Sequence, residues 1–386
     1  MSNVTELKKP KKLYNSVFMN VPTEYTIIFI TMFLVAFGII MVYSSSFYST
    51  ITKGNVEPYV KQIVFASIGF VAMYIVSRIQ LSFLNRFAFL GYFVTIGLLV
   101  VVLFIAHDVK GSQRWIPIGD FNLQPSEIAK FTIIIVLGSL LTLFKKHLSN
   151  VKVIGIIMLV IIIPIGLIAK EDLSAAIIVT GICVAMIFVA FKDVIKIVFL
   201  GIFMGGIGVS FLLLSTYRVT RIKTYLEGPW SDPEGNGRQI IQSLYAIGSG
   251  GLTGIGLGQS MQKMGYISEA HNDIIFAIIC EELGLLGGIA IIGLFIILLY
   301  RIAQISITAR SMNHFLVGIG VMTHIGLQVF INIGVATNLV PTTGMPLPFI
   351  SYGGSSLIMF LVEIGLVLNI ARHNRIEEVI GGDKIE

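Results

Sequence analysis

Long apolar runs recur along the whole chain and are separated by short polar segments. Hydrophobic residues make up 55% of the 386 residues and charged residues only 12%, against roughly 25% charged residues in a typical globular protein. A run of about 20 apolar residues is long enough to cross a bilayer as a helix. The chain is therefore predicted to be an all-α, polytopic membrane protein. A single integral domain is expected, because no polar segment is long enough to build a core of its own.

The pattern predicts ten transmembrane helices joined mostly by short loops. The expected spans are 25–46, 62–79, 86–106, 127–144, 152–169, 173–191, 195–215, 272–300, 312–337 and 353–371. Lys and Arg of the short loops gather on the N-terminal side of this scheme, which places both termini in the cytoplasm. The domain scheme is then a cytoplasmic tail 1–23, a membrane domain 24–372 with an extracellular loop at about 216–270, and a cytoplasmic tail 373–386. The first span is too long for a cleaved signal sequence and is expected to be retained.

The fourth span must include charged residues. Its charge-free part, Phe131 to Phe144, would be roughly 21 Å long as a helix and is too short for a hydrocarbon core of roughly 30 Å. The helix must therefore extend back over Glu127 and Lys130, whose i,i+3 spacing allows an ion pair on one face.

The last third of the chain must double back. No formal charge occurs from Ser311 to Val362, and a single helix of that length would reach about 78 Å. The Pro- and Gly-rich segment 338–354 is the expected reversal, on the outer side, where protein or a wet cavity must satisfy the irregular backbone. Glu363 falls inside the last span and is interpreted as a protonated or hydrogen-bonded carboxyl that faces the bundle.

The polar stretch from Ser215 to Glu269 leads to a candidate site at the start of the eighth span. There Asp273 stands at the edge of an apolar run, where an ionisable group costs free energy unless it has a partner or a function. A helix N-cap is one interpretation of Asp273 and a catalytic carboxylate is the other; composition does not separate them. Glu281 and Glu282, two to three turns later, are expected to have structural roles.

Several other site classes are disfavoured. The run GSGGLTGIGLG at 248–258 lacks the GK[ST] ending of a phosphate-binding loop and follows no strand, so a flexible loop is expected. No HExxH, CxxC or EF-hand pattern indicates a metal cage. The net charge of +6 is explained by membrane topology, and no nucleic acid partner is expected. Arg114, in an interfacial turn at 111–127, is either an interface anchor or a phosphate ligand.

Five stretches resemble the SEDS (shape, elongation, division, sporulation) family of peptidoglycan polymerases. They are MVYSSS (41–46), GSQRWIPIGDFNLQPSEIAKF (111–131), KEDLSAA (170–176), the run from Tyr245 to Gly287 and LVPTTGMPLPFISYGGSS (339–356). The sequences SLYAIGSGG and EAHND resemble the FtsW and SpoVE type more closely than the RodA type. One departure is the sequence EDLSAA at 171–176, where the family commonly has Pro-Asp-Leu-Gly-Thr-Ala.

The resemblance implies a peptidoglycan glycosyltransferase that polymerises lipid II outside the cytoplasmic membrane, in division or sporulation. It implies that Asp273 is the essential carboxylate and general base. Arg114 and Lys130 are the candidates for stabilising the departing pyrophosphate, and Glu127 is expected to hold Lys130 in place. The turn that contains Ser351, Gly353 and Gly354 is expected to shape the substrate cavity through close approach of its backbone. His271 completes the expected set of substrate-binding residues. A divalent cation (Mg²⁺ or Mn²⁺) is a candidate cofactor, whereas no nucleotide is expected because the donor carries its own pyrophosphate leaving group. The expected partners are a class B penicillin-binding transpeptidase, division proteins at the septum and membrane lipids.

Two other functions stay open from the sequence. A lipid II flippase would need a similar outward cavity without a base, but the expected inverted repeat with a second broken helix is not found in the first half. A scaffold that only recruits a transpeptidase would leave the polar residues of the outer side unexplained.

Overall fold

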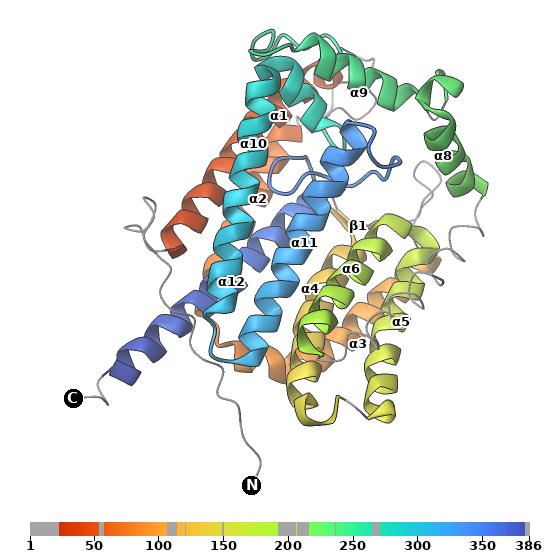
Figure 1. Ribbon diagram of the computed structural model, residues 1–386. Helices are drawn as coiled ribbons and strands as arrows, with labels where there is room; N and C mark the ends of the chain where they lie inside the picture. The colour runs from red at the N-terminus through yellow and green to blue at the C-terminus, as the bar shows by residue number, and fades with distance from the viewer. Residues whose placement is uncertain are drawn as a thin grey trace.

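The computed structural model describes residues 23–53, 58–105, 114–119, 121–148, 150–191, 206, 216–235, 237–264 and 271–382. These residues form a bundle of long helices, with shorter helices across one end (Figure 1). The long helices are α1 (Thr23–Lys53), α2 (Pro58–Arg78), α3 (Leu81–Ile105), α4 (Pro125–Leu143), α5 (Val151–Glu171), α6 (Leu173–Ala190), α10 (Ile275–Ile307), α11 (Met312–Ala336) and α12 (Gly354–Gly382). The short elements are strands β1 (Ile116–Ile118) and β2 (Phe121–Leu123), helices α8 (Thr216–Glu227) and α9 (Arg238–Ser249), and the 3-10 turns Lys145–His147 and Pro229–Ser231.

The polytopic helical fold predicted from the apolar runs is confirmed. Within the described ranges, nine helices are long and apolar enough to cross a membrane, and they correspond to nine of the ten expected spans. The expected seventh span, 195–215, lies outside the described residues and stays a prediction. The start of α6 and helix α8 both contact the same segment, since Ser174 and Arg221 donate to the carbonyls of Thr343 and Thr342. Because α6 is about 27 Å long, the described residues on either side of 195–215 lie at opposite ends of the bundle.

The first helix begins and the last helix ends on the same side of the bundle. Helices α1 and α2 are consecutive and antiparallel, and Tyr43 in the second half of α1 contacts Tyr59 at the start of α2. Helix α12 runs parallel to α2, because Gly69 packs on Leu361 and Gly365 packs on Met73 further along. Thus α12 ends where α1 begins, which fits the expected cytoplasmic position of both termini.

Burial separates the central helices from the peripheral ones. Most side chains of α4 and α12 are inside the protein, whereas most side chains of α2 and α3 are not. Helix α3 exposes Phe83, Phe93 and Phe104, which would be costly in water but is favourable against lipid. Buried polar side chains occur on the central helices, among them Lys130 on α4, His324 on α11 and Glu363 on α12.

The expected reversal between the last two spans is confirmed. Helix α11 ends at Ala336 and α12 begins at Gly354, and the backbone between them takes left-handed angles at Asn338, Gly344 and Phe349. This reversal segment, 337–353, receives hydrogen bonds from side chains of neighbouring helices. Its irregular carbonyl groups are thereby satisfied by protein, as a membrane environment requires.

The glycine-rich run 248–258 is not the flexible loop that was expected, because it pairs with a break in α10. At Gly284 the backbone leaves the helical conformation (φ 71°, ψ −173°). Ile255 donates its backbone N–H to the carbonyl of Glu281 (3.0 Å), and Leu285 donates to the carbonyl of Gly251 (2.9 Å). A Cβ atom on Gly284 would come within 2.4 Å of the backbone of Leu252, so the close approach of the two chains requires glycine.

Candidate functional site

Asp273 lies in the turn 271–274 that precedes α10, and it is half-buried. The N-cap residue of α10 is Ile274 rather than Asp273, so the structure does not support the capping interpretation. Instead the Asp273 carboxylate faces α9, where Nε2 of Gln239 donates to Oδ1 (3.1 Å) and Oδ2 (3.2 Å). The Gln239 amide thus contacts both oxygens of the Asp273 carboxylate and restrains its orientation from the side of α9.

The backbone around Asp273 is tied to α11 and to the reversal segment. Nδ2 of Asn332 donates to the Asp273 carbonyl (2.9 Å). Gly344 is so near that a Cβ atom built on it would stand 3.9 Å from Oδ2 of Asp273. The carbonyl of His271 accepts the backbone N–H of Tyr352 (2.9 Å), and the His271 ring meets the Tyr352 ring edge-on at 5.5 Å. The structure therefore brings Asp273 and His271 to one place between α9, α10 and the reversal segment.

The predicted ion pair of the fourth span is confirmed. Nζ of Lys130 lies 2.8 Å from Oε1 of Glu127, and neither side chain is more than 1% exposed. Lys130 also donates to Oε1 of Gln328 on α11 (3.1 Å). In this conformation the Lys130 ammonium is therefore enclosed by protein. Direct contact of Glu127 or Lys130 with substrate stays a prediction, and the observed contacts give them a role in holding α4 against α11.

Glu363 is a hydrogen-bonded carboxyl that faces the bundle, as expected. Both of its oxygens lie 2.8 Å from Nδ1 of His324. Nε2 of His324 in turn lies 3.2 Å from Oε1 of Gln328, the acceptor of Lys130. A continuous polar chain therefore crosses the protein core from α12 through α11 to α4.

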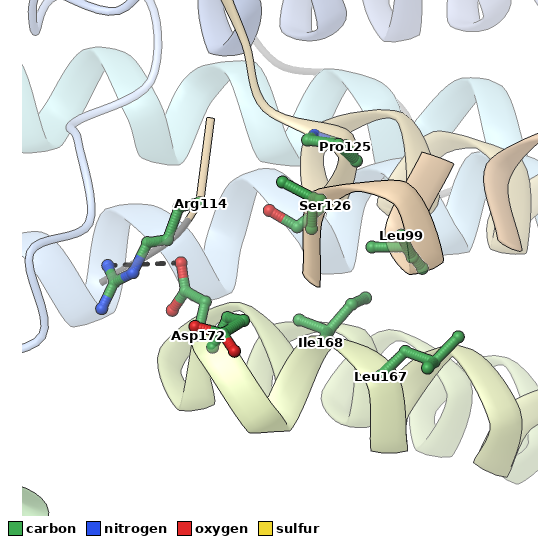
Figure 2. Close-up of a pocket in the computed structure, with 9 residues that line it drawn as sticks. Leu99, Arg114, Pro125, Ser126, Leu167, Ile168 and Asp172 are labelled. Atoms are coloured by element: carbon green, nitrogen blue, oxygen red, sulfur yellow. Dashed lines mark ion pairs between the residues drawn. The ribbon is translucent and has the colours of Figure 1, made fainter. Parts of the chain in front are cut away.

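Arg114 lies at a separate place, beside the start of α6. Its Nη1 atom lies 3.4 Å from Oδ2 of Asp172, and the Arg114 side chain is 22% exposed. Asp172 is the one residue of EDLSAA's first two positions that matches the Asp of the family sequence Pro-Asp-Leu-Gly-Thr-Ala. It is the N-cap of α6, and its side chain accepts the N–H of Ala175 (3.0 Å). Figure 2 shows Arg114 and Asp172 at one end of a pocket whose other end is apolar; its lining is Leu99, Val102, Arg114, Pro125, Ser126, Leu167, Ile168, Glu171 and Asp172. Two buried atoms there, Nε of Arg114 and Oγ of Ser126, have no hydrogen-bond partner among the described residues.

Ser351, Gly353 and Gly354 fasten the reversal segment to α2. The Ser351 hydroxyl accepts the N–H of Leu347 (2.7 Å), and its carbonyl accepts Nε2 of Gln62 (3.1 Å). Gly353 donates to Oε1 of the same glutamine (3.4 Å). At Gly354 a Cβ atom would come within 2.7 Å of a side-chain ring on α2. The close backbone approach expected of this motif is present, but the group approached is α2.

Glu281 and Glu282 have the structural roles that were expected. Glu281 accepts the hydroxyl of Ser260 and the N–H of Met261. Glu282 forms a buried ion pair with Lys263 (2.8 Å). Both carboxylates lie on α10 and therefore secure residues 260–263, near the end of the long polar loop, against this helix.

Sequence reasoning missed three amide residues of the site, Gln239, Gln328 and Asn332. The search followed formal charges, and an amide carries none. A signal did exist for two of them, because the i,i+4 spacing of Gln328 and Asn332 places two polar side chains on one face of an apolar helix. Gln239 is brought to Asp273 by the path of the loop, for which the sequence holds no local signal.

The described residues do not form a dedicated metal cage, since no three side chains of His, Cys, Asp or Glu gather within them. The divalent cation named as a candidate cofactor therefore stays a prediction.

A family model described as "cell cycle protein", which covers FtsW, RodA and SpoVE, matches residues 25–376. The chain is 40% identical over 361 residues to stage V sporulation protein E of Bacillus subtilis (strain 168), covering 91% of this chain and 98% of that protein. It is 37% identical over 357 residues to the probable peptidoglycan glycosyltransferase FtsW of Coxiella burnetii (strain RSA 493 / Nine Mile phase I), covering 89% and 95%.

Two solved structures have a similar fold. One comes from work titled "Structural coordination of polymerization and crosslinking by a peptidoglycan synthase complex", with a TM-score of 0.76, 26% identity, and coverage of 91% of this chain and 98% of that chain. The other is the rod shape determining protein RodA of Thermus thermophilus, with a TM-score of 0.68, 25% identity, and coverage of 91% and 97%.

Proposed function

Because the chain belongs to the family of FtsW, RodA and SpoVE cell cycle proteins, we propose that it is a peptidoglycan glycosyltransferase that polymerises lipid II in division or sporulation. Relatives named as peptidoglycan glycosyltransferases support the activity. The observation that carries the proposal for this chain is the half-buried Asp273 carboxylate, oriented by Gln239 and not used as a helix cap.

Asp273 acts as the general base in this proposal. It takes the proton from the 4-hydroxyl of the acceptor sugar as that oxygen attacks the anomeric carbon of the donor. The new glycosidic C–O bond forms while the bond from the anomeric carbon to the pyrophosphate breaks, and undecaprenyl diphosphate leaves. A positioned base of this kind contributes about 10²- to 10⁴-fold in rate. The remaining acceleration comes from alignment of two lipid-anchored sugars and from stabilisation of the charge on the departing pyrophosphate.

Stabilisation of the leaving pyrophosphate is assigned to a cation on the outer side. Arg114 is suited to it, because its guanidinium is partly exposed beside a pocket and can form paired hydrogen bonds to phosphate oxygens. Lys130 is enclosed by Glu127 and Gln328, so it would support the site through the position of α4 and its electrostatic potential. Any divalent cation would depend on phosphate oxygens of the substrate for most of its ligands.

The location and partners follow from the same family. Nine apolar helices among the described residues support a multi-pass membrane protein, and we place it in the bacterial cytoplasmic membrane at the division septum. The solved structure titled as a peptidoglycan synthase complex supports a crosslinking partner. A class B penicillin-binding transpeptidase is the partner proposed here, together with division proteins.

The proposal is tested by incubating the purified protein with fluorescent lipid II and separating the products on a gel. The wild type should give a ladder of glycan strands, and Asp273→Asn should give none while it keeps the elution profile of the wild type. Glu227→Gln is the matched control, because it removes an exposed carboxylate of the same extracellular loop; this variant should polymerise normally. A full ladder from well-folded Asp273→Asn would refute the role of Asp273. If the wild type made no glycan but moved lipid II across vesicle membranes, the protein would be a flippase.

A further inference from the structure

A stripe of three polar side chains runs along the face of α11 that points into the protein. His324, Gln328 and Asn332 follow one another at i, i+4 and i+8, and each is at most 1% exposed. Polar groups buried this deeply in a membrane helix cost free energy unless they are bonded or functional. The stripe leads from the Glu363 carboxyl in the middle of the bundle to the backbone of Asp273 at its outer end.

Asn332 joins two segments that meet only in the folded protein. Its Nδ2 atom donates one hydrogen to the carbonyl of Asp273 (2.9 Å) and the other to the carbonyl of Met345 (2.7 Å). A carbonyl oxygen can only accept, so the amide nitrogen must face these two groups and the orientation of the side chain is fixed. Gln328 makes the same kind of contact with the next residue of the reversal segment, since its Nε2 atom donates to the carbonyl of Pro346 (3.1 Å).

The Asn332 side chain is bonded on one side only. Its Oδ1 atom is buried and has no hydrogen-bond partner among the described residues. An unpaired buried acceptor lowers stability. If packing were the only role of this position, an apolar side chain of the same size would serve it better than asparagine. What the amide supplies is two donors at the place where the turn of Asp273 meets the reversal segment.

We propose that Asn332 is a positioning residue, which fixes the backbone of Asp273 against Met345 and so aims the Asp273 carboxylate past Gly344 toward the reacting sugar. The inference rests on the proposed function, because it assumes that this carboxylate is the base. Gln239 restrains the carboxylate from the side of α9, and Asn332 restrains the main chain of the same residue from α11. Together they leave the carboxylate little freedom in the bundle.

Removal of the two donors should lower kcat and leave KM for lipid II unchanged within about twofold. The reason is that a displacement of about 1 Å at a reacting group can cost on the order of 10²-fold in rate. Asn332→Leu keeps the side-chain size and removes both donors, and we expect a fall in kcat of about 10- to 100-fold. Asn332→Ser keeps one donor and should fall between Asn332→Leu and the wild type.

Asn313→Leu is the matched control. Asn313 is on the same helix, is also buried and also has an unpaired Oδ1, but it lies 19 residues earlier, about 28 Å along the axis. Its replacement removes no hydrogen bond to the turn of Asp273 or to the reversal segment, so kcat should not change. Equal kcat losses in the two variants would reduce Asn332 to a structural residue.

Hydrogen exchange provides a readout that needs no activity. In detergent, Asn332→Leu should raise amide exchange in peptides that cover 271–274 and 343–350, whereas Asn313→Leu should not. Unchanged exchange there, or an unchanged kcat in folded Asn332→Leu, overturns the inference; if Asn332→Leu does not fold, Asn332→Ser decides by the same measurements. A wild type without polymerase activity would instead refute the proposed function, and the exchange result would still decide whether Asn332 ties the two segments.

Discussion

Lys130→Met is the substitution whose effect can be worked out most fully from the structure. The ammonium of Lys130 lies 2.8 Å from Glu127 and 3.1 Å from Gln328, and its side chain is 0% exposed. Removal of the cation leaves the Glu127 carboxylate buried without its counter-charge, and such a break costs about 3–5 kcal/mol. The unfolding entropy of globular proteins is about 2.1 cal/mol/K per residue, which is about 0.8 kcal/mol/K for a chain of this length. The melting temperature should therefore fall by about 4–6 °C.

The assay is thermal unfolding in detergent, followed by the fraction of protein that stays monodisperse. The double variant Glu127→Gln with Lys130→Met removes both charges and keeps the side-chain sizes, so it should recover most of the loss. Lys223→Met is the control, because its ion pair with Glu227 is exposed and spans 3.7 Å; no measurable change is expected. Two results would show that the charge pair is not the source of the stability. One is a fall in melting temperature of less than about 1 °C for Lys130→Met. The other is a double variant whose loss equals the sum of the losses of the two single variants.

Three further outcomes are expected. Gly284→Ala should unfold at a lower temperature or fail to express, because the left-handed backbone and the touching loop leave no room for a Cβ atom. Gly293 has open space around it, so the control Gly293→Ala should behave like the wild type. Equal stability of the two variants would contradict this account. Lys263→Met should destabilise the folded protein by about as much as Lys130→Met, since it removes the cation of a second buried ion pair, and an unchanged melting temperature would contradict that. Cys183 and Cys280 are both buried, so neither thiol should react with a maleimide in the folded protein at pH 7, and rapid labelling before unfolding would disprove their burial.

Burial also affects Tyr352, whose ring contacts the His271 ring. Desolvation raises the pKa of the Tyr352 phenol above its usual value. The phenol beside His271 is therefore neutral throughout the physiological range and does not serve as an anionic partner in the site.

The sequence determined the features that depend on local composition. Apolar runs of sufficient length can only be satisfied as helices in lipid, so the span positions follow from the residues themselves. The pairing of Glu127 with Lys130 was predictable because i,i+3 spacing is a property of the helix. The reversal at 337–353 was predictable because one helix could not continue through a charge-free segment of that length.

Tertiary structure alone decided the contacts between residues far apart in the chain. Gln239 reaches Asp273, and Gln62 reaches Ser351 and Gly353, through paths that no local pattern specifies. The glycine-rich run had the composition of a flexible loop, yet the break at Gly284 gives its backbone groups partners. Asn332 had no charge to mark it, and its importance appears only when two carbonyl groups from distant segments converge on its amide. Long-range convergence of uncharged hydrogen-bonding groups is set by the packing of whole helices, and for that reason the sequence predicted the frame and the carboxylate but not the residues that hold the carboxylate in place.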